Sequence, residues 1–493
     1  MKQGMNKLAA RAALLSAVVA ALVSTGAIAA DDAEALLRRA DRAMGGADIK
    51  TLRFTASGTG STFGQAYKAD TKWPTLGYSS FARTLDYENG ALREEFARSR
   101  TEPTGGGAMP LLGLGEQRAT AFLHGTTAWN QTAPNTFGFA GAAVDGRIHD
   151  LWTSPHGVIK AALKNKATLT FRTEKGKSLA AVSFTEPGRF SATALINADY
   201  LVERVESKQP HPVLGDTALV TVYSDYRSFG EVKFPERIVQ THGATPLIDF
   251  GVGNVQVNQP SGITVPDNIK TAVERVTAEK VADGVWFLAG GSHNSVAIEM
   301  KDHMVLVEAP LYDGRTAAVL AEVKKLGGTK PLRYVINSHH HFDHAGGLRA
   351  AAAEGATLIT SAEAKTYFDK AFANPNSISP DLFAKSKKKA KIEGVNGKRV
   401  FSDGSRAFEV LFIRDSVHAA GFQMVYLPKE KLLIEGDAYT PQPPGAKPPA
   451  TPNGNNVNLV ENIEKMNLAV DKILPLHGRV VTLADLLTTA GRK

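Results

Sequence analysis

The sequence predicts an α+β protein with two domains, a mostly antiparallel β domain followed by a layered domain in which strands and helices alternate. The chain has 493 residues, which is more than one ordinary hydrophobic core accommodates. Its first half contains strand-like segments rich in Val, Thr, Phe and Tyr, separated by turn-forming residues. After residue 276 strands alternate with helices. We therefore expect domains at 31–270 and 271–493.

Residues 1–30 have the composition of a secretory signal peptide. Three basic residues, Lys2, Lys7 and Arg11, precede an uncharged run rich in Ala, Leu and Val, which ends in the small-x-small pattern Ala27-Ile28-Ala29. An uncleaved membrane anchor is the alternative. No later stretch approaches the ~20 apolar residues of a spanning helix. We therefore expect a periplasmic or secreted protein without stable membrane insertion after cleavage.

The composition is that of a soluble globular protein, with 43% hydrophobic and 22% charged residues. Cysteine is absent, so neither a disulfide nor a thiolate metal ligand is available. The formal net charge of +8 falls to +5 without the three basic residues of the expected signal peptide. The one compact basic run, 385–391, is typical of a solvated face, and nucleic acid is not an expected partner.

The expected β domain begins with a helix. Residues 33–44 carry apolar side chains at helical spacing and stop at Gly45-Gly46. Nine strands are expected after it, at 52–57, 78–87, 92–97, 167–172, 180–185, 189–196, 201–207, 218–226 and 237–242.

The segment 191–240 resembles the strands of bacterial outer-membrane lipoprotein-sorting and carrier proteins. The resemblance is in the strand pattern of SATALINADYLVERVES and VTVYSDYRSFGEVKFPERIVQ. It implies a curved antiparallel sheet that wraps a helix and forms an apolar trough. The alternative is a generic β accessory domain whose aromatic residues are core, with a role in substrate capture, positioning or formation of a homo-oligomer.

In the second domain the expected elements lead into a histidine cluster. Strands are expected at 285–288, 296–300, 304–308 and 332–336, and helices at 314–326 and from about 345. The cluster follows the strand 332–336 directly. Side chains two apart in extended backbone point the same way, so His339 and His341 can converge on one ion, and Asp343 and His344 can reach a second. Nitrogen and oxygen ligands suit zinc, with iron, manganese or cobalt as alternatives.

The pattern HxHxDH followed by Gly-Gly resembles the signature of the metallo-β-lactamase superfamily, and the resemblance extends over 276–493. It implies a four-layered αβ/βα fold with the site at one edge of two sheets. It also implies that His418, Asp437 and His477, each after a strand, are further ligands. The first ion would then lie on His339, His341 and His418, the second on Asp343, His344 and His477, with Asp437 as the bridge.

Such a site suits hydrolysis. Two divalent cations, here expected to be Zn²⁺, sit about 3.5–4 Å apart in such sites and produce a bridging hydroxide that attacks a small-molecule substrate. The absence of cysteine and the presence of Asp437 make the ligand set similar to that of glyoxalase II and lactonases rather than β-lactamases. An ester, lactone or amide is the expected bond. The alternatives are a phosphodiesterase or sulfatase, or a lipid-binding protein with a secondary metal domain.

Four neighbours of the cluster have open or secondary roles. Tyr439 is expected to act with the two aspartates in catalysis by donating a hydrogen bond to a developing oxyanion. His293 is either a substrate contact or a solvated loop residue. His340 is expected to point away from the ions, and Glu308 to support a ligand or the fold.

Two segments are expected to shape the substrate cavity. One is 367–391, which inserts polar and basic residues between ligand motifs. The other is 441–456, whose prolines and glycines exclude regular structure. A passive linker is the alternative for the second.

Overall fold

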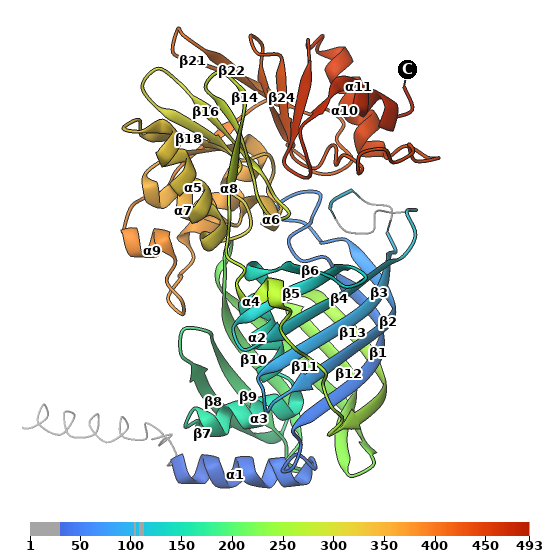
Figure 1. Cartoon of the computed structure of the whole chain (residues 1–493). Coiled ribbons are helices and arrows are strands. Elements are labelled where there is room, and N and C mark those ends of the chain that lie inside the picture. Colours follow the sequence, from blue (N-terminus) through green and yellow to red (C-terminus); the bar gives the residue numbers. More distant parts are fainter. Residues whose placement is uncertain (1–29, 103–104, 108–112, 493) are drawn as a thin grey trace, which may run out of the picture.

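The computed structural model describes residues 30–102, 105–107 and 113–492, arranged as a β-rich domain beneath a layered α/β domain (Figure 1). The expected signal peptide therefore lies, apart from residue 30, outside the described residues. No helix in the described part of the chain is long and apolar enough to span a membrane.

The N-terminal domain is built on a thirteen-stranded antiparallel sheet made of two meanders, β1–β6 and β7–β13, joined by the pairing of β1 with β13. The strands are β1 Thr51–Ser61, β2 Thr75–Asp86, β3 Ala91–Arg100, β4 Gln117–His124, β5 Thr127–Ala133, β6 Thr136–Phe139, β7 Thr168–Glu174, β8 Lys177–Glu186, β9 Phe190–Ile196, β10 Val202–His211, β11 Gly215–Phe229, β12 Val232–His242 and β13 Thr245–Val257.

Helices pack against one face of this sheet. They are α1 Ala30–Ala43, the 3₁₀ turn η1 Gly141–Ala143, α2 Val144–Trp152 and α3 Pro155–Lys164, with the short α4 Asp267–Lys270 after the last strand. Side chains alternate across β1, so that Leu52 and Phe54 enter a core that also contains Leu37 of α1 and Val158 of α3. The domain therefore has one large core between the sheet and its helices.

The C-terminal domain contains two sheets in the strand orders β14 to β20 and β21 to β26. The first sheet comprises β14 Thr277–Ala282, β15 Val285–Ala289, β16 Ser295–Glu299, β17 Met304–Val307, β18 Leu332–Ile336, β19 Thr357–Ser361 and β20 Lys391–Val395. The second comprises β21 Lys398–Ser402, β22 Ala407–Phe412, β23 Gln423–Leu427, β24 Leu432–Glu435, β25 Lys472–Pro475 and β26 Val481–Thr482.

The two sheets pack face to face and helices cover their outer faces. One core joins Val296 and Val307 of the first sheet to Val410 and Val425 of the second. Separate cores lie under the helices on each outer side. The helices are α5 Asp313–Gly327, α6 Phe342–Ala345, α7 Leu348–Glu354, α8 Ala362–Ala373, α9 Leu382–Ser386, α10 Gly454–Lys465 and α11 Leu483–Thr489. The four-layered αβ/βα fold expected from the resemblance is confirmed.

The nine expected strands of the first domain correspond to β1–β3 and β7–β12, and the expected first helix to α1. Four strands were missed, β4, β5, β6 and β13, together with helices α2 and α3. The segment of β13 contains Pro246, Gly251 and Gly253, which are typical of a linker. Pairing on both sides, with β1 and β12, nevertheless holds it in the sheet.

Among the described residues, hydrogen bonds join the two domains in two places. The turn between β10 and β11 meets the segment after α8, where the amide of Asp216 donates to the Pro375 carbonyl over 2.7 Å and the Asp216 carboxylate accepts from Ser377. The loop between β1 and β2, residues 62–74, reaches the edge of the C-terminal sheets. This second contact lies at the histidine cluster.

Candidate metal centre

The seven residues expected to be ligands all follow the ends of strands at one edge of the two sheets. His339 and His341 come after β18, and Asp343 and His344 lie in the short helix α6. The other three follow β22, β24 and β25 in the second sheet and are His418, Asp437 and His477. Strands of both sheets that end at the same edge therefore bring together residues from four separate segments.

The first group consists of His339, His341, His418 and Asp437, whose candidate ligand atoms all lie within 4.8 Å of one another. His339 Nε2 lies 2.9 Å from His341 Nδ1 and 3.1 Å from His418 Nε2. Three imidazole nitrogens thus converge from two segments of the chain.

The second group consists of His293, Asp343, His344 and His477, with the same maximum separation of 4.8 Å. His344 Nε2 and His477 Nε2 are 3.2 Å apart, and His293 Nε2 lies 3.2 Å from Asp343 Oδ2. The ring of His293 stacks edge-on against that of His477, with centroids 4.2 Å apart. Of the two readings left open for His293, the structure therefore excludes a solvated loop residue.

Asp437 lies between the two groups. Its Oδ2 is 3.0 Å from His418 Nε2, whereas its Oδ1 is 2.8 Å from His344 Nε2 and 2.9 Å from His477 Nε2. Oδ1 is buried, and the nitrogens of His344 and His477 lie within 3 Å of it. Neither of them forms a hydrogen bond of acceptable geometry with Oδ1, and no other described residue does. One carboxylate oxygen faces each group, which is the geometry of a bridge.

The outward-facing ring nitrogens have partners that fix the tautomers. His341 Nε2 lies 2.9 Å from the carbonyl oxygen of Ala66, and His477 Nδ1 lies 2.9 Å from that of Ser292. A carbonyl oxygen can only accept, so the outward nitrogen carries the proton in both rings. The inward nitrogen then presents a lone pair, as a metal ligand requires.

Glu308 fixes two more rings. His344 Nδ1 lies 2.9 Å from Glu308 Oε2, to which it donates. The Ser338 hydroxyl donates a hydrogen bond to the same carboxylate. The Ser338 oxygen in turn accepts a hydrogen bond from His339 Nδ1, which lies 3.0 Å away. Glu308 is fully buried and also accepts from Asn337 Nδ2 over 3.0 Å. It supports the ligands, one of the two roles expected for it.

Burial and neighbouring charge set the ionisation of the cluster. Burial, reinforced by neighbouring histidines, lowers the pKa of His339 and His341 well below the ordinary value. Burial has the same effect on His344, but Asp437 and Asp343 outweigh it and raise its pKa. The histidines in turn outweigh the burial of Asp437 and lower its pKa.

These residues fit divalent cations. Ring nitrogens that face one another at 2.9–3.2 Å repel unless a proton or a metal cation lies between them. The donor set is nitrogen and oxygen without sulfur, which suits zinc and several other divalent ions. The two groups could therefore each hold one ion.

Tyr439 does not join the cluster. Its side chain is buried in the core under α10 and α11, and its hydroxyl lies 3.2 Å from Thr489 Oγ1. The expected oxyanion role has no support in this geometry. His340 points away from the ions as expected, since its Nε2 donates to the Ala66 carbonyl over 2.9 Å.

A role of the N-terminal domain in substrate capture or positioning was expected, but its contact with a candidate metal ligand was not. Gln65, in the loop between β1 and β2, donates from Nε2 to Asp343 Oδ1 over 2.8 Å. The next residues anchor the loop: the carbonyl of Tyr67 accepts from the Ala420 amide over 2.7 Å, and its hydroxyl donates to the Ser416 carbonyl over 3.0 Å. Nothing local in the sequence marks Gln65, because its partner is 278 positions away.

A cavity of about 850 Å³ opens over both groups, and both domains line it. Phe63 and Gln65 form part of one wall, and Asp437 and His477 part of the other. The segment 441–456 lines it through Gln442, Pro449, Thr451, Asn453, Asn455 and Asn456. This segment therefore shapes the cavity, as expected, and is not a passive linker.

Comparison with known proteins agrees with this description. Residues 288–477 match the family model of the Metallo-beta-lactamase superfamily. Similar solved structures include a metallo-beta-lactamase from Pontibacter korlensis, with 19% identity over 44% of this chain and 98% of that one and a TM-score of 0.34. The metallo-beta-lactamase FIM-1 from Pseudomonas aeruginosa, in its mono-zinc form, has 19% identity over 44% of this chain and 95% of that one, with a TM-score of 0.33.

The DIM-1 metallo-beta-lactamase has 17% identity over 45% of this chain and 97% of that one, with a TM-score of 0.34. With TM-scores below 0.5, these similarities add nothing to what the family match and the two sheets show. The resemblance of the N-terminal domain to lipoprotein-sorting proteins stays a prediction. The family match over residues 288–477 and the four-layered fold make the C-terminal domain similar to the metallo-beta-lactamase superfamily, and this similarity supports a metal-dependent hydrolase.

Proposed function

We propose that this protein is an exported dinuclear metal-dependent hydrolase that cleaves an ester, lactone, amide or related bond. The observation that supports it most is the position of Asp437, whose two oxygens face two separate groups of imidazole nitrogens. Two bound divalent cations, proposed to be Zn²⁺, supply an acidified water nucleophile and polarise the scissile oxygen.

Side chains on both sides of Asp437 would hold the two metal ions in place. His339, His341 and His418 present three ring nitrogens on one side of Asp437, and His344 and His477 present two on the other. Glu308, Ser338 and backbone carbonyls fix the ring orientation from outside, because the outward nitrogens of four rings have an acceptor: those of His339, His341, His344 and His477. Such partners raise ligand basicity and prevent the rings from rotating.

Asp343 is held from two sides. His293 Nε2 lies 3.2 Å from one carboxylate oxygen, and Gln65 donates to the other over 2.8 Å. Each contact restricts rotation of the carboxylate, which would otherwise be free at the start of the short helix α6. The second ion is thus proposed to depend on residues of both domains.

The apolar character of the cavity favours an organic ester, lactone or amide over a phosphodiester or a sulfate. Phe63, Leu114, Phe342 and Pro449 contribute to its lining. A substrate with an apolar body displaces water from such a surface when it binds. Export is supported by the composition of residues 1–30.

The test combines elemental analysis of the purified protein with a panel of chromogenic esters, lactones, phosphodiesters and sulfates. Two equivalents of metal per chain and turnover of the carbonyl substrates are expected. The double variant His339→Ala/His341→Ala should lose one ion and all turnover, because the first group keeps a single imidazole. His124→Ala, at the end of β4, is the matched control. Unchanged metal content in the double variant would overturn the assignment.

A further inference from the structure

Arg98 of β3 is the one residue with a permanent positive charge among the described residues that line the cavity over the metal groups. Its Nε donates to Gln117 Oε1 over 2.8 Å, and its Nη1 donates to the Tyr78 hydroxyl over 3.2 Å. The guanidinium carbon lies 4.7 Å from the centre of the Phe96 ring. All three neighbours are neutral, so the described residues orient this cation without neutralising it.

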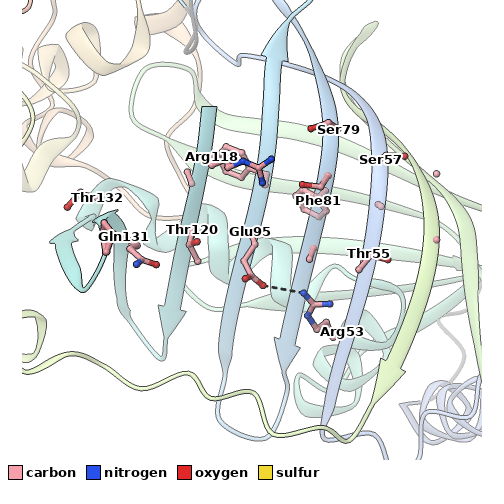
Figure 2. A pocket seen from close by; sticks show the side chains of 18 of the residues that line it. Arg53, Thr55, Ser57, Ser79, Phe81, Glu95, Arg118, Thr120, Gln131 and Thr132 are labelled. Carbon is pink, nitrogen blue, oxygen red and sulfur yellow. Dashed lines mark hydrogen bonds and ion pairs between the residues drawn. The ribbon is translucent and has the colours of Figure 1, made fainter. Parts of the chain in front are cut away.

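Other arginines of the sheet already have partners: Arg53 and Arg118 pair with carboxylates, and Arg100 donates to the backbone carbonyls of Glu102, Gly105 and Gly106. Figure 2 shows a second cavity, of about 830 Å³, over β1 to β5 of the N-terminal sheet. There Arg53 pairs with Glu95 at 3.4 Å, and Arg118 with Glu116 at 2.7 Å. A cation that already has a carboxylate partner gains little from a ligand anion, whereas Arg98 has no such partner among the described residues.

The sheet register explains why Arg98, and not Arg118, lines the cavity over the metal groups. Arg98 lies directly between Tyr78 on β2 and Gln117 on β4. Arg118 is one position further along β4, opposite Ala97, and successive side chains of a strand point to opposite faces. Arg98 therefore lines the cavity at the domain boundary and Arg118 lines the separate one.

Apolar side chains accompany this cation. An adjoining cavity of about 640 Å³ shares Leu114 and Thr451 with the first and is also lined by Val417. Leu114 and Val417 are 53% and 52% exposed, unusually open positions for large aliphatic residues. A ligand that covers them must have an apolar part.

From these contacts we propose that Arg98 binds a carboxylate of the substrate, whose apolar body fills the cavity and whose scissile bond lies at the metal groups. This inference rests on the proposed hydrolase function. The guanidinium forms two parallel hydrogen bonds with a carboxylate, and the surrounding apolar wall strengthens their attraction. The N-terminal domain then selects the substrate that the C-terminal domain hydrolyses.

A kinetic experiment compares an anionic with a neutral ester, mono(4-nitrophenyl) glutarate with 4-nitrophenyl butyrate. The ratio of their kcat/KM values should fall about 10- to 100-fold in Arg98→Gln, because one charge-assisted pair is lost. Arg98→Lys, which keeps the charge but not the planar fork, should restore part of the ratio. Arg118→Gln should leave the ratio as in the parent protein, because Arg118 is 75% exposed and belongs to the other cavity.

A binding experiment separates this inference from the proposed hydrolysis. Calorimetric titration of the metal-loaded protein with 5-phenoxypentanoate and with 5-phenoxypentan-1-ol needs no turnover. Arg98→Gln should weaken binding of the carboxylate about 10- to 100-fold relative to the alcohol. Selective weakening without turnover of either ester would refute the hydrolase and retain the carboxylate site. If the esters are hydrolysed but Arg98→Gln changes neither the ratio of their kcat/KM values nor the binding of the carboxylate, the carboxylate binds elsewhere and the role of Arg98 is overturned.

Discussion

Loss of the Gln65 amide should weaken one of the two metal ions while leaving the other in place. Gln65 donates over 2.8 Å to Asp343, a candidate ligand of the second group, and makes no hydrogen bond to the first. A hydrogen bond to a charged group contributes about 1.5–3 kcal/mol. In Gln65→Leu, which keeps the volume and removes the donor, the affinity for the second ion should therefore fall about 10- to 100-fold.

Gly107 offers an independent way to displace the same amide. A Cβ built on Gly107 would collide with Gln65 Oε1, so Gly107→Ala must push this side chain away. It should weaken the second ion without altering the chemistry of Gln65, and it should also disturb the first group, because the same Cβ would lie 3.1 Å from His341 Cε1. Gly146→Ala is the matched control, because a Cβ there meets nothing within 4 Å.

The assay is competition between the protein and a chromophoric chelator, which resolves two successive dissociation constants. Gln65→Leu should raise one constant and leave the other near that of the parent protein, whereas Gly107→Ala should raise both constants, because its Cβ also meets His341. Equal affinities in all four proteins would show that the N-terminal domain does not support the metal centre. An equal loss of both ions in Gln65→Leu would indicate general disruption of the site.

Three further predictions concern single side chains. Glu308→Gln should lower the affinity for the second ion about 10- to 100-fold in the same assay, because His344 loses a charged acceptor, and an unchanged constant would contradict this. Tyr439→Phe should alter neither metal content nor kcat. It should lower the free energy of unfolding by about 1 kcal/mol, because only the hydrogen bond to Thr489 is lost. A large fall in kcat would restore the oxyanion role. Burial lowers the pKa of His156 from 6.5 to about 4, so between these pH values the folded state binds fewer protons than the unfolded state. The free energy of unfolding should therefore fall by about 3 kcal/mol as the pH drops from 6.5 to 4. Urea unfolding across this range should show a smaller fall in His156→Gln, and parallel pH profiles would exclude the effect.

Much of the C-terminal fold could be predicted because its signals are local. Each strand before a candidate ligand is a short apolar run, such as Leu432–Glu435 before Asp437, and the ligand follows where the run ends. A spacing of two residues in extended backbone predicts the convergence of His339 and His341 without knowledge of the fold. The arrangement of the other ligands came from the resemblance to a family.

What sequence reasoning missed depends on contacts between distant segments. The contact between Gln65 and Asp343 follows from how two domains dock, which no periodicity encodes. His293 was left undecided because a loop histidine has no local signal for burial, and only the ring of His477 shows where it lies. Tyr439 was misjudged because an offset of two residues from Asp437 says nothing about a turn that directs the side chain into the core.

The central claim is that two cations share Asp437. An anomalous-diffraction map from crystals of the zinc-loaded protein, collected on both sides of the zinc absorption edge, tests it directly. Two peaks about 3.5–4 Å apart are predicted, one among His339, His341 and His418 and the other among Asp343, His344 and His477. A single peak, or a second peak away from the carboxylate, would contradict the account.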